Sequence, residues 1–431
     1  MRVLITGAYG LIGAACLAKL HAEGHDLIGA GRSIEEARRQ FPYAHWVAAD
    51  FRELTSPEKW HHLLEGIEAV VNCVGALQDG GRDDLQCVHV AAPAALFAAC
   101  EQKGIKRVVH ISAAGAAPDG PTAFARTKSE TERDLVRRAL DWIILRPALV
   151  LADGVYGGTA MLRGAAGFPL VTPIIAAKPI HVVAIEDVAE TVAWALRSGA
   201  PARLTFDLMH PQPIALATIV VSYRAWLGFK PQRALTLPRR ITTVAAWVAD
   251  EVSILGWRSP LRSTATAQLA AGIGGDPSDW MTATGITPKS LDDILARRPA
   301  TVQDRWFARL YLLKPVAIAV LAAFWIATGI IALGPGWNGA LLVLRIAGLG
   351  LQTAKIALVA GALLDIALGV AILIRRWCRP ALIGMLAVSI GYVVAAAVAD
   401  PPLFVDPLGS ILKIFPIMLA TTFVLAILDE R

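Results

Sequence analysis

Three glycines near the start of the chain carry the clearest chemical signal. The apolar run of residues 3–6 is followed at once by TGAYGLIG, residues 6–13, and then by a helical pattern up to about Glu23. In such a strand–turn–helix context the first glycine permits a tight turn, the second lets the backbone approach a pyrophosphate, and the third lets the helix pack closely on the strand. The N–H groups at the helix start add a partial positive charge. We therefore expect a bound dinucleotide here, held by Gly7, Tyr9, Gly10, Leu11, Ile12 and Gly13.

Two side chains bear on the choice between NAD and NADP. Arg32 and Ser33 follow the second expected strand, where NAD-binding sites place a carboxylate against the ribose 2′-hydroxyl. A guanidinium and a hydroxyl suit a 2′-phosphate better, so the sequence favours NADP(H) over NAD(H); the alternative for Arg32 is a side chain that faces solvent. Asp50, after the third expected strand, suits either the adenine amino group or a helix cap.

An alternation of strand-like and helix-like segments positions these residues. Short apolar runs alternate with helical patterns of 10–15 residues, which predicts an α/β, Rossmann-like, doubly wound parallel sheet. Ligands of such sheets bind beyond the carboxyl ends of the strands. The expected strands are 3–6, 26–31, 45–50, 69–75, 107–113 and 142–147, and the residues expected to face the cofactor after the later strands are Asn72, Gly75, Ser112 and Pro147.

Six segments in fixed order give the first 230 residues a family resemblance. They are TGAYGLIG, VNCVGA, HISAAGA, FARTKSETE, ILRPALVLADG and HVVAIEDVA. The set resembles the landmarks of atypical or extended short-chain dehydrogenase/reductases, with the greatest similarity to the NmrA-like proteins and to the NAD(P)H-binding accessory subunit of respiratory complex I. The resemblance implies a nucleotide-binding core over residues 1–150 and a substrate lobe over 151–300.

The resemblance also implies an active site, from which one residue is missing. In that superfamily a tyrosine exchanges a proton with the substrate oxygen, a lysine orients the nicotinamide ribose, and a serine holds the substrate oxygen. Ser112 and Lys128 match the serine and the lysine, whereas Phe124 stands at the tyrosine position. Loss of a positioned general acid costs about 10²–10⁴-fold in rate, so ordinary carbonyl reduction is in doubt. Tyr156 is a candidate substitute, although an ordinary loop aromatic is the interpretation we favour for it.

The sequence pattern of the expected substrate lobe is weaker than that of the nucleotide-binding core. Residues 185–196 predict an amphipathic helix, and the resemblance implies that Asp187 helps to close the substrate cleft. Residues 239–257 place Ile241, Val244, Val248 and Val252 along one helical face. That face could pack on the core, line an apolar cleft or rest on a bilayer, and core packing is the interpretation we favour. GIGGDPSD, residues 272–279, predicts a turn and not a second nucleotide loop, because no strand precedes it.

Composition locates a membrane domain at the other end. The chain has 431 residues, 55% of them hydrophobic, with a net charge of +6, and the apolar excess lies after residue 310. A basic and aromatic linker, 301–314, precedes four apolar stretches of about twenty residues, each long enough to span a bilayer as a helix. We therefore expect a transmembrane four-helix bundle over 315–431, with spans at about 315–333, 356–374, 381–399 and 408–428.

This C-terminal part resembles the DoxX-like membrane domains, including the segment DPLGSILK before the last span. The N-terminal MRVLITG is a strand pattern and not a signal peptide, so we expect the first 300 residues in the cytosol. Four spans then place the C-terminus and the connection bearing Arg375, Arg376 and Arg379 in the cytosol, as the positive-inside rule requires. The stretch 340–351 is too short to span, and we expect it either to lie at the outer surface or to re-enter the membrane.

Two charged residues fall within the expected spans. Asp365 lies mid-span and Lys413 near the outer end of the last span. Charges in a bilayer are costly unless they are paired or face a cavity, so Asp365 suggests an ion pair or a polar, quinone-like site, whereas Lys413 can snorkel outward.

The residue inventory also excludes some classes of function. The five cysteines have neither CxxC spacing nor a matching histidine pair, so we expect them to be core residues in a reducing compartment and expect no metal site. The scattered arginines favour a membrane surface over nucleic acid.

Together these features predict an inner-membrane, multi-pass protein whose cytosolic domain performs redox chemistry on a lipophilic partner, a quinone or a lipid. The alternative is a non-catalytic NAD(P)H-binding sensor, or an assembly or accessory factor of a membrane redox complex.

Overall fold

The computed structural model describes residues 1–80, 84–257, 259–407 and 409–428. The chain divides into two compact units, each described here by itself. The first comprises Met1–Asp250 and Ser259–Arg305, and the second comprises Glu251–Arg258 and Trp306–Arg431. One boundary between them falls inside helix α9 (Arg239–Ile254), after Asp250. Another falls inside helix α13 (Val302–Tyr311), in the segment expected to be a linker.

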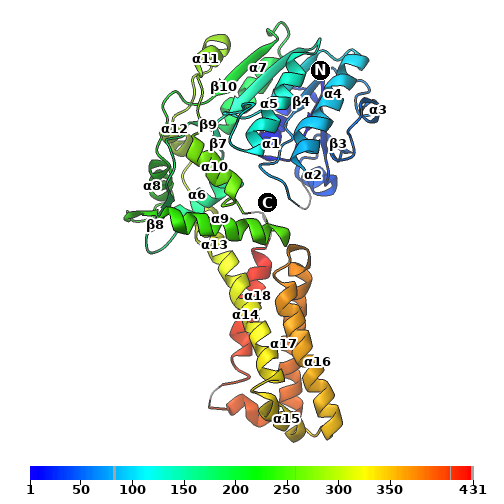
Figure 1. The fold of residues 1–431 in the computed structure, drawn as a ribbon, viewed down its shortest axis with the longest axis vertical. Helices are drawn as coiled ribbons and strands as arrows, with labels where there is room; N and C mark the ends of the chain where they lie inside the picture. Colours follow the sequence, from blue (N-terminus) through cyan, green and yellow to red (C-terminus); the bar gives the residue numbers. More distant parts are fainter. Residues whose placement is uncertain (81–83, 258, 408, 429–431) are drawn as a thin grey trace. The chain divides into compact units, whose positions relative to one another are not determined.

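The first unit is built on a sheet of seven parallel strands (Figure 1). The six expected strands are present, and β10 is a seventh that the sequence analysis did not identify. The strand order is β10-β6-β5-β4-β1-β2-β3, so the carboxyl ends of all seven strands lie at one edge. The strands are β1 (Arg2–Thr6), β2 (Asp26–Gly31), β3 (His45–Ala48), β4 (Ala69–Asn72), β5 (Arg107–Ile111), β6 (Asp141–Pro147) and β10 (Leu204–Leu208).

Alternating side chains bury both faces of this sheet. Val3 and Ile5 belong to one core cluster, while Leu4 between them belongs to the other, as expected when successive side chains point to opposite faces. Helices on both faces confirm the doubly wound prediction. The first cluster includes residues of α1 (Leu11–Ala22), α2 (Ile34–Gln40), α7 (Ile185–Leu196) and α11 (Ser278–Thr284), and the second includes residues of α3 (Pro57–Trp60), η1 (Gln86–Ala91), α4 (Ala92–Lys103) and α5 (Ala123–Val136).

Residues after β6 add two small sheets and further helices. β7 (Leu149–Leu151) pairs with β9 (Val182–Ala184), and β8 (Thr172–Ile175) pairs with β11 (Ala234–Leu237). Asp187 at the start of α7 is buried and accepts hydrogen bonds from the backbone N–H and the ammonium of Lys289. The remaining helices are α6 (Gly158–Ala166), α8 (Leu216–Trp226), α9 (Arg239–Ile254), α10 (Ser263–Ala271) and α12 (Leu291–Ala296).

The structure corrects one expectation for this lobe and confirms another. The apolar face of α9 does not pack on the core: Ile241, Val244, Val248 and Val252 are all exposed. Helical periodicity shows which side chains share a face but not what covers that face, and here the small residues Ala246 and Ala249 point inward. Residues 272–277 form an irregular segment between two helices, as predicted for GIGGDPSD.

The second unit is all-helical. Among the described residues, three helices are long and apolar enough to cross a membrane: α14 (Leu313–Leu333), α16 (Leu351–Ala371) and α17 (Arg375–Ala399). The expected fourth span contains the 13-residue helix α18 (Ile414–Ala426), which is shorter than the stretch 408–428; residue 408 lies outside the described residues. A turn over Ser410–Lys413 precedes α18, with Ser410 bonded to Asp406.

Two segments of this unit that were expected between the spans lie partly or wholly within helices. Residues Ile372–Ile374 alone connect α16 to α17, so the three arginines of the expected connection instead belong to the first turns of α17. The short stretch 340–351 falls largely in α15 (Trp337–Ile346), and the 3₁₀-helix η2 (Pro401–Val405) follows α17.

Candidate nucleotide and active site

The glycine segment forms a tight connection between β1 and α1. Gly7 has a φ of +64°, and the N–H of Gly10 donates to the Gly7 carbonyl over 2.9 Å. A Cβ on Gly13 would overlap that same carbonyl oxygen and lie 2.9 Å from Ala8 Cα. Leu11 and Ile12 begin α1, whose first turn holds no acidic residue. The helix N-terminus and the missing Cβ atoms fit the pyrophosphate of a dinucleotide.

Tyr9 connects this segment to the end of β2. Its hydroxyl oxygen accepts hydrogen bonds from the backbone N–H of Arg32 (3.1 Å) and of Ser33 (3.3 Å). A Cβ on Gly31 would overlap the Tyr9 ring. The tyrosine thus fixes the backbone at residues 32 and 33, whose side chains are exposed at the edge where a ribose 2′-substituent would lie. Ser33 occupies the N-cap position of α2, but its side chain accepts no capping hydrogen bond there.

Asp50 lies beside a second arginine that the sequence analysis missed. The Arg52 guanidinium donates to both carboxylate oxygens of Asp50, at 3.1 Å from Nε to Oδ1 and 2.5 Å from Nη2 to Oδ2. These hydrogen bonds, with a smaller contribution from the charge of Arg32, lower the pKa of Asp50 despite its partial burial. Asp50 also caps the local turn through the N–H of Arg52. Two cations therefore lie near the Asp50 carboxylate, and its expected adenine contact stays a prediction.

The side chain of Asn72, at the end of β4, forms hydrogen bonds with residues of the neighbouring strands β1 and β5. The side chain is fully buried, and its Oδ1 accepts from the Thr6 hydroxyl (2.7 Å) and the Val74 N–H (3.3 Å). Because Oδ1 is the acceptor, the amide nitrogen must donate to His110 Nδ1, 3.1 Å away. The Asn72 side chain is committed to the protein, where it shapes the loop that leads to Gly75.

Lys128 lies at the carboxyl ends of β4 and β5. Its ammonium donates to the Ile111 carbonyl over 2.9 Å, and a Cβ on Gly75 would lie 3.3 Å from Nζ. Burial lowers the pKa of Lys128 to about 8, although the charge of Glu132 opposes the shift. A side chain at position 75 would therefore crowd the ammonium, which retains its charge near neutral pH.

Phe124 lies one helical turn before Lys128 on α5, the spacing expected for the tyrosine position. Its ring is half-buried and meets the His89 ring edge-on, with centroids 5.6 Å apart. His89 belongs to η1, a π-helix, and its Nε2 accepts from the Ala76 N–H (3.1 Å). Nδ1 must then carry the hydrogen and donate to the Thr127 hydroxyl (2.9 Å). Burial and the charge of Lys128 lower the pKa of His89 to about 2, so the ring stays neutral.

Ser112 follows β5, and its hydroxyl is already engaged. It donates to the buried carboxylate of Glu132 on α5, one turn after Lys128. Arg146 on β6 pairs with the same carboxylate, with 2.9 Å from Nε to Oε1. The i, i+4 spacing from Lys128 to Glu132 was the signal in the sequence that could have revealed this network, because both side chains lie on one helical face.

The two remaining candidates occupy different environments. Pro147 is buried as the last residue of β6, and its carbonyl accepts from the Ala114 N–H over 3.0 Å. Tyr156 lies in the loop before α6 with 43% of its surface exposed, in keeping with a loop aromatic.

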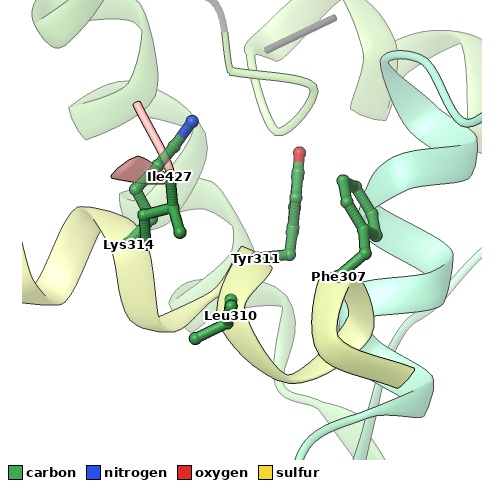
Figure 2. Close-up of a pocket in the computed structure, with 5 residues that line it drawn as sticks. All are labelled: Phe307, Leu310, Tyr311, Lys314 and Ile427. Carbon is green, nitrogen blue, oxygen red and sulfur yellow. The ribbon is translucent and has the colours of Figure 1, made fainter. Parts of the chain in front are cut away.

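The second unit contains a buried carboxylate and a pocket. Asp365 on α16 is buried and accepts a hydrogen bond from the Tyr392 hydroxyl on α17 over 3.0 Å, which joins the two helices by a polar contact. Lys413 is exposed and precedes α18. A pocket of about 200 Å³ is lined by Phe307, Leu310, Tyr311, Lys314 and Ile427. Figure 2 shows the hydroxyl of Tyr311 and the amine of Lys314 pointing to the same side of it.

Two known families match the chain, one within each of the two compact units. Residues 7–197 match a family described as NAD(P)H-binding, and residues 322–422 match the DoxX-like family.

Three curated relatives each match a part of the chain. An uncharacterized protein of Mycobacterium tuberculosis is 26% identical over 216 residues, 48% of this chain and 22% of that protein. Sterol demethylase protein B of Methylococcus capsulatus is 27% identical over 172 residues, 35% of this chain and 52% of that protein. The mitochondrial protein FMP52 of Saccharomyces cerevisiae is 30% identical over 163 residues, 36% of this chain and 67% of that protein. The chain thus spans a fifth to two thirds of their lengths.

Solved structures share the fold. UDP-glucuronic acid 4-epimerase from Bacillus cereus, in complex with NAD, is 17% identical and aligns with a TM-score of 0.53 over 72% of this chain and all of that one. The enzyme WbmH of Bordetella bronchiseptica, in complex with NAD⁺, is 18% identical with a TM-score of 0.51, over 68% of this chain and 96% of that one.

Proposed function

The chain belongs to the NAD(P)H-binding proteins of Rossmann fold and continues into a DoxX-like domain with three candidate membrane-spanning helices, and we propose a function from this combination. We propose that the protein is a membrane-anchored oxidoreductase that uses NADP(H) on a lipophilic substrate. The observation that carries the proposal is a buried Lys128 beside the nucleotide loop, on a chain that also has three helices long and apolar enough to cross a membrane. A quinone or a lipid is the substrate class that such a chain meets most readily.

The preference for NADP(H) rests on two arginines. Arg32 is exposed after β2, and Arg52 holds Asp50 nearby, so a 2′-phosphate would meet two guanidinium groups. The Asp50 carboxylate is neutralised by Arg52, which removes the repulsion that a free carboxylate would exert. Charge-assisted hydrogen bonds from arginine to phosphate are about twice as strong as neutral ones.

The hydrogen bonds and contacts of each side chain in the site indicate its role in the proposed reaction. The nicotinamide, when bound, supplies or accepts the hydride. Lys128 binds the ribose hydroxyls and, with a pKa of about 8, holds a proton at Nζ that it can release near neutral pH. Phe124 and the neutral His89 shape the wall beside it. Ser112 orients Glu132, because its hydrogen is donated to that carboxylate.

Two features support a lipophilic substrate. The Methylococcus relative is named for sterol demethylation, and sterols are apolar. In the second unit, the pocket beside α13 and α14 combines apolar walls with the polar ends of Tyr311 and Lys314, which suits a molecule with one polar end.

A second candidate function is that of a nucleotide-binding sensor, or of an assembly or accessory factor for a membrane redox complex. Phe124 favours it, since that position offers no proton, and so does the engagement of the Ser112 hydroxyl by Glu132. In that case nucleotide would bind without being consumed.

Consumption of NADPH by the full chain in vesicles of native membrane lipid separates the two functions. The proposal predicts slow oxidation that requires the lipid and is lost in Gly13→Ala, whose methyl group would overlap the Gly7 carbonyl. Gly158→Ala is the matched control, because no atom lies within 4 Å of the added Cβ. Tight binding of NADPH without any lipid-dependent oxidation would favour the sensor.

A further inference from the structure

Helix α9 exposes its large apolar side chains instead of burying them. Trp247 is 63% exposed and Val244 is 59% exposed, while the buried residues of the helix are Ala246 and Ala249. Sixteen residues make a helix about 24 Å long. Its exposed apolar residues, which we call the α9 apolar face, are Ile241, Val244, Trp247, Val248, Val252 and Ile254.

The inward side of α9 is held by small and polar contacts. Ala246 and Ala249 permit a close approach to the protein, and the Asp250 carboxylate accepts a hydrogen bond from Arg262 Nε over 2.9 Å. Ile241, Val244, Val248 and Val252 recur every three or four residues, so they lie on the other side. The helix is therefore oriented by its protein contacts with the α9 apolar face turned outward.

Four exposed cationic side chains lead into the start of α9, and they indicate which kind of partner the helix binds. Lys230, Arg233, Arg239 and Arg240 are all exposed and fall within the eleven residues that lead into its first turn. An apolar helical face next to a group of cations is the pattern of helices that lie in the headgroup layer of a bilayer, and anionic lipids attract such cations.

The residues after α9 are anchored to the end of two candidate spans. The Arg375 N–H donates to the Leu255 carbonyl over 2.9 Å, and the Trp257 indole N–H donates to the Leu373 carbonyl over 2.6 Å. The Arg375 guanidinium also lies over the Trp257 ring, 5.4 Å from its centroid. Leu373 belongs to the connection between α16 and α17, and the connection between two spans lies at a membrane surface. Residues 255–257, which directly follow α9, therefore lie at that surface too.

We propose that the α9 apolar face binds the surface of the lipid bilayer, with the side chains of Val244, Trp247 and Val248 inserted below the headgroups. The cations at the start of the helix contact anionic headgroups. This lipid-binding surface is independent of the redox chemistry, and holds whether or not the protein turns over NADPH.

Spin labels on the full chain in vesicles of phosphatidylcholine and phosphatidylglycerol test this proposal. Val244→Cys and Val248→Cys each carry a nitroxide on the α9 apolar face. Val136→Cys on α5 is the matched control, because Val136 is also an exposed helical valine. The unsubstituted protein measures any labelling of the native cysteines. Collision rates with oxygen, which concentrates in lipid, and with a water-soluble nickel complex give the depth of each label.

Labels at positions 244 and 248 should collide often with oxygen and rarely with nickel, at a depth of about 5–10 Å below the headgroup boundary. The label at position 136 should show the reverse. Frequent nickel collisions at positions 244 and 248 would overturn the proposal by showing a surface in water. Rare collisions with both reagents, or dipolar coupling between labels, would overturn it by showing a protein contact or a second copy.

A charge-removing variant tests the lipid preference. Arg239→Gln with Arg240→Gln should reduce the measured depth in vesicles that contain phosphatidylglycerol and change it little in phosphatidylcholine alone. An equal effect in both lipids would contradict the assignment of these arginines to anionic headgroups.

Discussion

The hydroxyl of Ser112 donates a hydrogen bond to the carboxylate of Glu132, and the guanidinium of Arg146 donates to the same carboxylate. The serine that the family resemblance assigns to the substrate oxygen is therefore engaged within the protein. With Phe124 at the neighbouring position, Lys128 is the group of this site that carries an exchangeable proton near neutral pH.

Phe124→Tyr should raise any reduction of simple ketones or aldehydes, by up to about 10²-fold, because it restores a positioned acid. The new phenol would lie one turn from the Lys128 ammonium, whose charge should lower its pKa. Steady-state NADPH oxidation measures the effect, and Phe124→Leu is the control that should show no gain. If the wild type is already active and the tyrosine changes nothing, another residue donates the proton, and Tyr156 is the first to replace.

Arg52→Gln should weaken NADPH binding about tenfold or more, since a hydrogen bond to a charged group contributes about 1.5–3 kcal/mol. NADH, which lacks the 2′-phosphate, should bind the variant almost as it binds the wild type. Arg32→Asp should go further and reverse the preference by repelling the phosphate. Calorimetry with both nucleotides tests this, and equal affinities of the wild type for NADPH and NADH would remove the basis of the prediction.

Nucleotide affinity should fall as the pH rises above about 8. Burial lowers the pKa of Lys128 from 10.5 to about 8, so the free protein loses this proton as the pH passes 8. Binding through the ammonium must then recover a proton, which weakens affinity by at most about tenfold per pH unit. The same shift makes the free energy of unfolding rise between about pH 8 and 10.5, where the unfolded chain holds the proton more tightly.

Lys128→Met is the variant that isolates this effect. It should bind NADPH more weakly at pH 7 and show a flat profile between pH 7 and 9. A wild-type affinity that stays constant across this range would show that the ammonium does not contact the nucleotide.

The orientation of the spans should follow their cations. In intact cells, a cysteine introduced in the connection of Ile372–Ile374 should be protected from a membrane-impermeant thiol reagent, while one in Asp400–Asp406 should react. A tag after residue 431 decides the role of α18, since four spans return the C-terminus to the cytosol and three leave it outside. We predict a cytosolic tag, and an external one would reduce the bundle to three spans.

Local patterns in the sequence predict six of the seven strands of the sheet, because a buried parallel strand has a short run of apolar residues. β10 was missed since its sequence, LTFDL, lacks such a run and its place in the sheet depends on pairing with β6, 57 or more residues earlier in the chain. The glycine segment was predicted because each glycine is required by local backbone geometry.

Side-chain partners were harder to predict than elements. Arg52 and Glu132 each lie close in sequence to a predicted site residue, so spacing could have suggested them. His89 could not be found in this way, because a π-helix brings it beside Phe124 from more than thirty residues away. The exposure of α9 depends on what covers a helical face, and periodicity carries no information about that.

Transfer of deuterium from NADPH labelled on the nicotinamide tests the central claim most directly. The full chain in vesicles of native membrane lipid is incubated with the labelled nucleotide, and the extracted lipids and quinones are analysed by mass spectrometry. The account predicts deuterium in one apolar species, absent when Gly13→Ala replaces the wild type and retained with Gly158→Ala. Saturating nucleotide binding with no deuterium in any extracted species would contradict the redox function.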